Sequence, residues 1–268
     1  MSTVPPASRA TGHVTALMYH ALCAAETPPG QDPHYTVAQD VFDRQLDALG
    51  RGRSLGSARD WLQGAPHDVL VTFDDGHVSN HALAFPALLQ RGVAADFFVN
   101  PAMVGTGGFA TWAQLREMSD AGMSIQSHGY DHVYLTSLGG KELRATLRAA
   151  REEISQQVGK DVTLLAPPGG RMPSGLADIA LECGYTHVLS SRPGRIGRNR
   201  TARRILPRMA ITAATSADLL YAWTGDSRGA MLREQFRYGS LAFAKRVLGD
   251  ARYERARARA LAAIRGPA

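Results

Sequence analysis

The stretch Val69-Leu70-Val71-Thr72-Phe73-Asp74-Asp75-Gly76 predicts a buried strand that runs into two carboxylates and a glycine. An apolar run of this length, ended by a turn residue, is typical of a strand in a protein core. Folds of the α/β class place their chemistry at the carboxyl ends of such strands. Neighbouring strand residues point to opposite sides, so Asp74 and Asp75 can take different roles, one holding a metal and one handling a proton. Taken alone, however, Asp-Asp-Gly is more often a turn or a helix cap.

A second stretch, Ser127-His128-Gly129-Tyr130-Asp131-His132, strengthens the chemical interpretation. It follows a short strand-like run at 122–126, so both histidines lie at a strand end. Two imidazoles and one carboxylate form a common metal-ligand set that leaves room for water. A lone pair of histidines four residues apart is weak evidence, but its combination with residues 72–76 is strong.

These two segments resemble the first two motifs of the polysaccharide deacetylases, the NodB-type carbohydrate esterase group. The similarity covers about residues 14–212. It also includes the segments 17–20 (LMYH), 42–49 (FDRQLDAL), 75–80, 97–99, 111–115, 166–170 and 205–208.

Strand-like and helix-like segments alternate along the chain, which predicts βα units and a parallel sheet. This alternation suits an open sheet or a closed barrel. The resemblance favours the barrel, since the family fold is a distorted (β/α) barrel with about seven parallel strands. We expect a disordered leader at 1–13, the catalytic domain at 14–212, and a basic helical extension at 213–268 packed on the barrel. Its expected helices are Ala217–Trp223, Ala230–Phe236, Leu241–Leu248 and Tyr253–Ile264.

The resemblance implies roles for four residues. Asp75, His128 and His132 match the family's metal-binding positions, and these ligand types suit Zn²⁺, although cobalt or nickel could substitute. Asp74 matches the catalytic base, which takes a proton from the attacking water.

The third family motif departs from its commonest form. Ala166 stands where many members have an arginine, and Gly169 stands where an aromatic residue is common. The backbone N–H of Gly169 could still face a developing oxyanion. Arg171 could hold Asp74 or a substrate phosphate, or lie exposed in a loop.

The last motif departs too, because Arg208 stands where many members have a histidine that acts as general acid. Arginine does not give up its proton in the working pH range. Arg208 could instead orient Asp74 or stabilise charge. The proton donor then remains open between Asp74 itself, His20 and His77, the two histidines being expected near the substrate. Trp112 is expected to line the mouth of the site or, equally, to belong to the core.

Charge is unevenly distributed along the 268 residues, whose formal net charge is +6. Residues 1–191 hold 13 basic and 19 acidic side chains, whereas residues 192–268 hold 17 and 5. Seven arginines lie between Arg192 and Arg208 with no acidic residue among them. Such a block can attract phosphates, an acidic glycan or an anionic membrane, or can simply be a solvated surface. No nucleic-acid-binding motif accompanies it.

The compartment is predicted from what the sequence contains. Cys23 and Cys183 do not form a disulfide framework. No apolar run reaches the length needed to span a bilayer, and residues 1–12 have no apolar signal core. We therefore expect a cytoplasmic protein, with membrane association through its basic part as a further expectation.

The leading functional hypothesis is a metal-dependent hydrolase that removes acetyl groups from an N-acetylated sugar or glycan. A cytoplasmic location would favour a phosphate-linked precursor of a surface polysaccharide as the substrate. One alternative is a deformylase or amidase that acts on a non-sugar amide. Another is a glycan-binding module that has lost activity.

Overall fold

The computed structural model describes residues 12–27, 31–199 and 203–248, with side chains described up to residue 240. Most of the predicted leader and the predicted helix Tyr253–Ile264 lie outside these ranges. The chain divides into two compact units, Met1–Ser227 and Arg228–Ala268. No helix in the described ranges combines the length and the apolar character that a membrane span requires.

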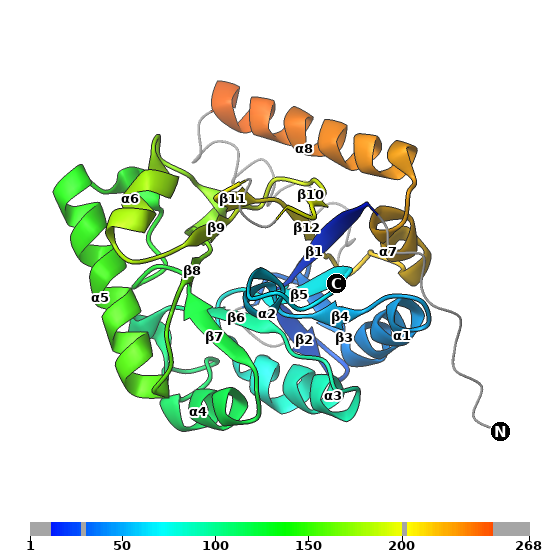
Figure 1. Ribbon diagram of the computed structural model, residues 1–268, viewed down its shortest axis with the longest axis horizontal. Coiled ribbons are helices and arrows are strands. Elements are labelled where there is room, and N and C mark those ends of the chain that lie inside the picture. The colour runs from blue at the N-terminus through cyan, green and yellow to red at the C-terminus, as the bar shows by residue number, and fades with distance from the viewer. Residues whose placement is uncertain (1–11, 28–30, 200–202, 249–268) are drawn as a thin grey trace, which may run out of the picture. The chain divides into compact units, whose positions relative to one another are not determined.

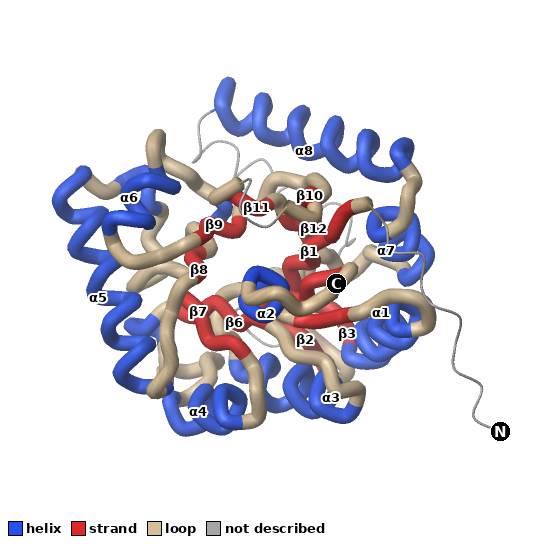
Figure 2. The backbone as a smooth tube through the Cα atoms, viewed as in Figure 1, coloured by secondary structure: helices blue, strands red, loops and turns tan. Residues whose placement is uncertain are grey.

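The first unit is built on a mostly parallel sheet that nearly closes into a barrel, as the sequence and the resemblance predicted (Figure 2). Its strands run in the order β10-β1-β5-β6-β7-β8-β9-β11, with β12 also paired to β1 and β4 to β5. Among the strands that the structure describes in this sheet, β10 alone is antiparallel to its neighbour, β1. The strands are β1 (His13–Tyr19), β4 (Leu55–Gly56), β5 (Val69–Phe73), β6 (Asp96–Val99), β7 (Ser124–Ser127), β8 (Leu164–Leu165), β9 (His187–Leu189), β10 (Ile196–Gly197), β11 (Ile205–Leu206) and β12 (Arg208–Ala210).

Helices surround the ring of strands (Figure 1). They are α1 (Gln39–Gly50), the π-helix η1 (Asn80–Ala84), α3 (Phe85–Gln90), α4 (Trp112–Asp120), α5 (Gly140–Val158), α6 (Leu176–Glu182) and α7 (Ala217–Thr224). Short 3₁₀ turns occur at η2 (Pro101–Met103), η3 (Leu135–Ser137) and η4 (Pro168–Gly170), and a separate two-stranded sheet pairs β2 (Ala21–Cys23) with β3 (Thr36–Ala38).

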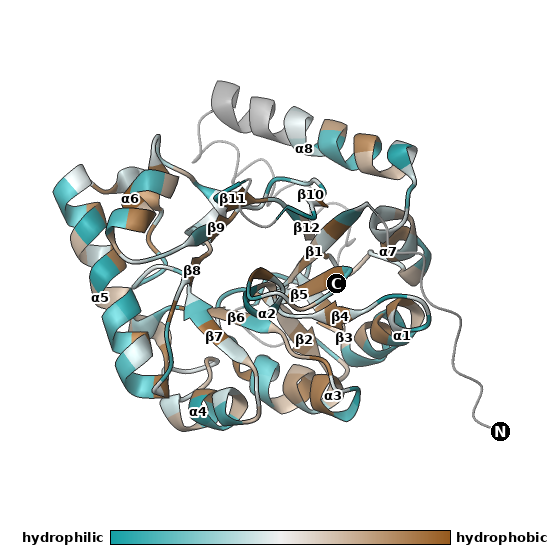
Figure 3. Ribbon diagram, in the orientation of Figure 1, coloured by the Kyte–Doolittle hydropathy of each residue, from teal (hydrophilic) through white to brown (hydrophobic). Residues whose placement is uncertain are grey.

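The helix α5 shows how sequence pattern sets these positions. Its buried residues recur every three or four positions, so they form one apolar stripe along the helix. The opposite face is hydrophilic (Figure 3). The helix ends at Gly159, whose φ of 67° is a left-handed conformation that glycine adopts without a steric cost.

Apolar side chains of the strands and of the short helix α2 (Ala58–Leu62) pack in one buried cluster. Trp61 of α2 is fully buried and packs in one cluster with Leu70 of β5 and Phe98 of β6. The ring is therefore a packed core, and polar chemistry is confined to its rim.

The first compact unit includes α7, which packs against α1, and Arg53 donates to the carbonyl of Thr224. The expected domain limit at 212 stays a prediction, but one expected helix boundary differs from the structure. The two helices expected at 230–236 and 241–248 are a single helix, α8 (Arg228–Leu248). The helix continues through Gly239 because one glycine costs only about 1 kcal/mol, too little to end it.

The fully buried Asp96 of β6 yields a first testable prediction. Its carboxylate accepts the N–H groups of Ala58 at 2.5 Å and Arg59 at 3.3 Å, in the first turn of α2. Burial raises the pKa of Asp96 from 3.8 to about 6. Between these two values the folded protein holds a proton that the unfolded chain releases, so the free energy of unfolding should fall as pH rises, by up to about 3 kcal/mol.

Urea denaturation of the wild type and Asp96→Asn across this pH range would measure the effect. The variant should lack this part of the pH dependence. An identical pH dependence in both proteins would contradict the assignment to Asp96.

Candidate metal and catalytic site

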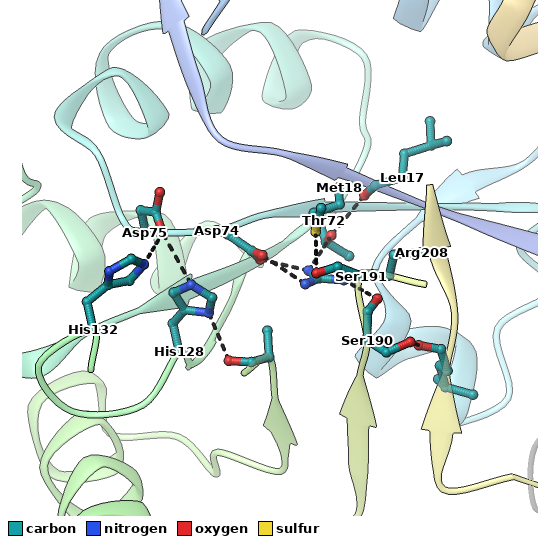
Figure 4. Close-up of polar contacts among 12 residues, drawn as sticks. Leu17, Met18, Thr72, Asp74, Asp75, His128, His132, Ser190, Ser191 and Arg208 are labelled. Carbon is teal, nitrogen blue, oxygen red and sulfur yellow. Dashed lines mark hydrogen bonds and ion pairs between the residues drawn. The ribbon is translucent and has the colours of Figure 1, made fainter. Parts of the chain in front are cut away.

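The two adjacent aspartates diverge at the end of β5. All five residues of β5 are buried, and the N–H of Asp74 donates to the carbonyl of Tyr19 at 2.9 Å, which extends the pairing with β1 by one residue. Asp75 then adopts a φ of 74° and Gly76 one of 71°. Because the backbone turns here, the Asp74 carboxylate faces Arg208 and the Asp75 carboxylate faces the two histidines (Figure 4).

The histidine loop is held in place by its neighbours. The N–H of His128 donates to the carbonyl of Val99 at 2.8 Å, and the Asn100 side chain donates to the carbonyl of His128 at 2.5 Å. The ring of His128 is buried, and its Nδ1 lies 2.8 Å from the carbonyl oxygen of Ala166. A carbonyl can only accept, so Nδ1 carries the proton and Nε2 presents a lone pair.

Asp75, His128 and His132 form the candidate metal site. The Nε2 atoms of both histidines lie 3.2 Å from Oδ1 of Asp75, and the three ligand atoms all lie within 4.8 Å of one another. The lone pair of His128 Nε2 faces a carboxylate oxygen, and two acceptors at this distance repel unless a proton or a cation lies between them. The residues therefore fit a divalent metal bound by one carboxylate and two imidazoles.

Backbone conformation also distinguishes this group. Within the described ranges, Asp75 (φ 74°) and His132 (φ 62°) are the only non-glycine residues with positive φ. Such conformations are uncommon and persist where surrounding structure holds them, as at functional sites.

The local electrostatics keep Asp75 ionised. Burial alone would raise the pKa of Asp75. Where a proton rather than a cation lies between each imidazole and Asp75, the contacts with His128 and His132 are hydrogen bonds, which outweigh burial and hold the pKa of Asp75 well below its usual range. The hydrogen bond to Asp75 in turn raises the pKa of His132. An ionised carboxylate is the form that a metal requires.

Asp74 forms a buried bidentate ion pair with Arg208. The two guanidinium NH groups donate to the two carboxylate oxygens at 2.7 and 2.8 Å, and Arg208 is fully buried. Arg208 also donates to Oγ1 of Thr72 at 3.1 Å and to the carbonyl of Ser190 at 3.3 Å. This planar two-bond geometry fixes the orientation of the Asp74 carboxylate.

The same pair sets the proton affinity of Asp74. Burial would raise the pKa of Asp74, but the charge of Arg208, the charge of His128 when that ring is protonated, and the hydrogen bond from Arg208 lower it below the usual value. Asp74 is therefore ionised throughout the neutral pH range, as a general base must be.

His20 and His77, the two rival proton donors, lie in different surroundings. His20 follows Tyr19 at the end of β1, and the carbonyl of Tyr19 accepts the N–H of Asp74, so the two strand ends are adjacent. The charge of His20 is among the causes that lower the pKa of both aspartates. Its buried Nδ1 has no hydrogen-bond partner among the described residues. His77 is only 2% exposed, and its Nδ1 lies 2.7 Å from Oγ and 3.1 Å from N of Ser79. The placement of His77 favours a structural role over the predicted contact with substrate.

The remaining predicted substrate contacts are Trp112, which is the first residue of α4, and Gly169 and Arg171, which lie in the segment after β8. Trp112 is half-buried and follows Ala110, whose N–H donates to the carbonyl of Gly76. Gly169 has a φ of 59° in the loop after β8, and the guanidinium of Arg171 lies 5.2 Å from the centroid of the Tyr134 ring. Arg208, rather than Arg171, is the arginine that holds Asp74 in the ion pair described above. Substrate contact at Trp112, Gly169 and Arg171 stays a prediction.

Sequence reasoning missed residues that support the site from a distance. Asn100 holds the histidine loop and Ser190 holds Arg208, each through a single hydrogen bond. The centroid of the Tyr35 ring lies 4.7 Å from that of His20. These residues carry no motif. Their one signal is position: Asn100 directly follows β6 and Ser190 directly follows β9, and polar residues at the ends of parallel strands meet at one rim.

Comparison with known proteins agrees with this geometry. Residues 63–188 match the family model described as polysaccharide deacetylase. This segment is a polysaccharide deacetylase domain. The resemblance inferred from the motifs is thereby confirmed, and the matched segment contains Asp74, Asp75, His128 and His132.

A curated relative and several solved structures extend the comparison. The deacetylase domain is similar to YxkH of Bacillus subtilis (strain 168), named for the polysaccharide deacetylase family, with 29% identity over 132 residues. The alignment covers 49% of this chain and 47% of YxkH, so the chain spans about half the length of this relative.

The fold is also that of solved deacetylases. The Streptococcus pyogenes deacetylase PplD, solved in complex with acetate, has a TM-score of 0.72 at 22% identity, covering 80% of this chain and 98% of PplD. The polysaccharide deacetylase BC0361 of Bacillus cereus has a TM-score of 0.70 at 23% identity, covering 80% of this chain and 69% of BC0361. The predicted NodB-type distorted barrel is confirmed.

Proposed function

We propose that this protein is a metal-dependent hydrolase that removes acetyl groups from an N-acetylated sugar of a glycan. One observation carries the proposal: within a polysaccharide deacetylase domain, a carboxylate and two imidazoles converge beside a second, buried carboxylate. The first three form a metal site, and the fourth is placed to handle a proton.

Asp75, His128 and His132 would hold the metal, and their one-oxygen, two-nitrogen donor set favours Zn²⁺. When bound, such an ion polarises the acetyl carbonyl and activates a water molecule at neutral pH. The protein fixes this donor set through the Ala166 carbonyl, which orients His128.

Asp74 would act as the general base that accepts a proton from the attacking water. Its bidentate contact with Arg208 leaves a lone pair on each carboxylate oxygen available, since an ionised carboxylate offers about four acceptor positions. Arg208 is a positioning residue here. It is fully buried and always protonated, so it does not supply the proton for the leaving amine.

His20 is then the strongest candidate for the general acid. It follows the strand end that pairs with Asp74, is only partly buried, and keeps a ring nitrogen without a hydrogen-bond partner among the described residues. The packed ring of Tyr35 limits its orientation. In this role His20 would protonate the amine as the carbon–nitrogen bond breaks.

The role of His20 gives a second prediction. His20→Gln should lower kcat for acetate release by about 100-fold, because the leaving amine loses its proton donor, while metal content and KM stay near the wild-type values. Steady-state kinetics on the metal-loaded proteins would test this. A His20→Gln variant with wild-type kcat would indicate that Asp74, rather than His20, protonates the leaving amine.

We further propose that the sugar substrate is linked to a phosphate, because the positive charge of the basic segment after residue 192 would attract it. Part of that segment is engaged within the protein: Arg195 donates to the carbonyls of Gly225 and Ser227, and Arg198 pairs with Asp68. Arg203 is exposed, and Arg200 lies outside the described residues.

Arg203→Ser should raise KM for a phosphorylated N-acetylated sugar and not for its neutral counterpart. An unchanged KM would show that Arg203 does not contact a phosphate of the substrate.

We also propose a cellular location for the protein, based on the proposed substrate. A cytoplasmic enzyme acting on a glycan precursor at an anionic membrane would use the exposed arginines of the basic segment. Sedimentation with anionic and with neutral vesicles would separate a membrane-bound protein from a freely diffusing one.

Acetate release tests the proposed activity itself. The metal-loaded protein should liberate acetate from N-acetylated sugars or oligosaccharides, and chelation should stop the release. Formate release, or turnover only on non-sugar amides, would favour the amidase alternative. Bound metal with no turnover on any amide would favour a binding module.

A further inference from the structure

The helix α8 of the second compact unit carries two large apolar side chains that face solvent. Leu232 is 63% exposed and Phe236 is 78% exposed, which makes them the two most exposed of the large apolar residues in the described ranges. They lie four residues apart, so they are neighbours on one face of the helix. Single exposed apolar residues are common, but two adjoining ones form a surface whose removal from water is favourable.

The apolar positions continue along the helix as a narrow stripe. α8 is one continuous helix up to Leu248 (Figure 1). Positions 243 and 247, which the sequence fills with phenylalanine and valine, fall in line with Leu232 by the helical period. A stripe with spacings of four and seven residues is typical of a helix that lies along an apolar surface.

Positive charge lies beside this stripe and dominates the unit. Arg233 and Arg237 are exposed, and each follows an apolar residue of the stripe by one position, so both lie along the same edge of it. Arg237 also pairs with Glu234, the one acidic residue in the sequence of α8. Residues 228–268 hold 10 basic and 3 acidic side chains. This excess is complementary to an anionic lipid surface, and it opposes the association of two copies of α8.

We propose that α8 lies on the surface of an anionic lipid bilayer, with Leu232 and Phe236 inserted among the acyl chains and Arg233 beside the headgroup phosphates. The proposal deepens the location proposed above: it names the element that makes the contact and adds apolar burial to charge attraction. A narrow stripe offers little apolar area, so insertion and charge act together. Because α8 follows the deacetylase domain in the chain, binding would retain the enzyme at the membrane.

The experiment measures how the full-length protein partitions between solution and sedimented vesicles. The vesicles contain phosphatidylglycerol and phosphatidylcholine in equal parts, or phosphatidylcholine alone. The variants are Leu232→Gln/Phe236→Gln, Phe236→Trp, Arg233→Gln and the matched control Leu89→Gln/Leu181→Gln. Leu89 on α3 and Leu181 on α6 are 52% and 45% exposed, so the control removes exposed apolar side chains elsewhere. Glutamine is a good helix former, so each variant should keep the helical circular dichroism of the wild type.

The double variant Leu232→Gln/Phe236→Gln should bind the anionic vesicles about thirtyfold more weakly, at low and at high salt, because salt does not screen apolar burial. Arg233→Gln should bind about fivefold more weakly at low salt, and the difference should shrink as salt rises. Phe236→Trp, which keeps an apolar ring suited to the interface, and the matched control should stay within about twofold of the wild type.

Three results would overturn the proposal. Equal binding by the wild type and the double variant would leave only the charge attraction of the basic segment. No binding of the wild type to anionic vesicles would exclude a membrane contact altogether. A dimer in the absence of vesicles that becomes a monomer in the double variant would assign the stripe to a second copy of the chain.

Sedimentation with vesicles requires neither metal nor substrate, so its result is independent of the proposed activity. Vesicle binding without acetate release would support the interfacial helix while the deacetylase proposal fails. Acetate release without vesicle binding would have the opposite meaning.

Discussion

Replacing His128 with alanine is expected to abolish metal binding and to lower the rate of acetate release about a thousandfold. His128 is buried, and its tautomer is set by the Ala166 carbonyl, so its Nε2 is the most rigidly placed of the three ligand atoms. Loss of the metal removes several kcal/mol of transition-state stabilisation, and each 1.4 kcal/mol corresponds to about tenfold in rate.

The measurement is metal content by mass spectrometry together with kcat/KM, on protein shown to be folded by its circular dichroism. His81→Ala is a suitable control, because His81 also contacts a carboxylate, that of Glu117 at 2.9 Å, but on the helical pair η1 and α4. This control should retain one metal ion per chain and wild-type activity. A metal-loaded, active His128→Ala protein would show that the metal, if any, is bound elsewhere.

Replacing Asp74 with asparagine is expected to lower kcat about a thousandfold while the metal content stays at the wild-type level. The loss falls in the range typical of a positioned general base, and Asp74 contacts Arg208 rather than the three metal ligands. The variant thus separates proton transfer from metal binding. Equal losses of metal and of activity would mean that Asp74 is itself a ligand.

Arg208→Gln tests the ion pair between Asp74 and Arg208 by removing the positive charge. Arg208 lowers the pKa of Asp74, so the variant should raise that pKa, and the loss of activity on acidification should begin at a higher pH than in the wild type.

The free energy of unfolding should also depend on pH through this ion pair. The depressed pKa of Asp74 contributes stability above its unfolded value of 3.8, and this stability is lost as pH falls through the folded value. Leaving a buried carboxylate without its partner should further cost about 3–5 kcal/mol of unfolding free energy, measurable by urea denaturation.

The central strand and the four residues of the site could be predicted from sequence because their signals are local. Five consecutive apolar or β-branched residues specify β5, and two short motifs at strand ends place Asp74, Asp75, His128 and His132 at one rim. The long amphipathic helix α5 was equally clear from its period and from the glycine at its end.

Short and non-local features could not be predicted in this way. Strands such as β10 and β11 contain two residues each, too few to show a period, and exist because neighbouring strands pair with them. The pairing of Asp74 with Arg208 joins residues 134 positions apart, and it was suggested only by the place of Arg208 in the last family motif, as one of two roles. The close approach of Tyr134 to Gly169 likewise joins two loops that the sequence separates.

A crystal structure of the zinc-soaked protein, with anomalous data collected at the zinc absorption edge, tests the central claim most directly. We expect one zinc ion per chain, about 2.0–2.2 Å from Oδ1 of Asp75 and from the Nε2 atoms of His128 and His132, with the Asp74–Arg208 ion pair intact beside it. A zinc ion bound away from these three side chains, or a site that stays empty at saturating zinc, would contradict the account.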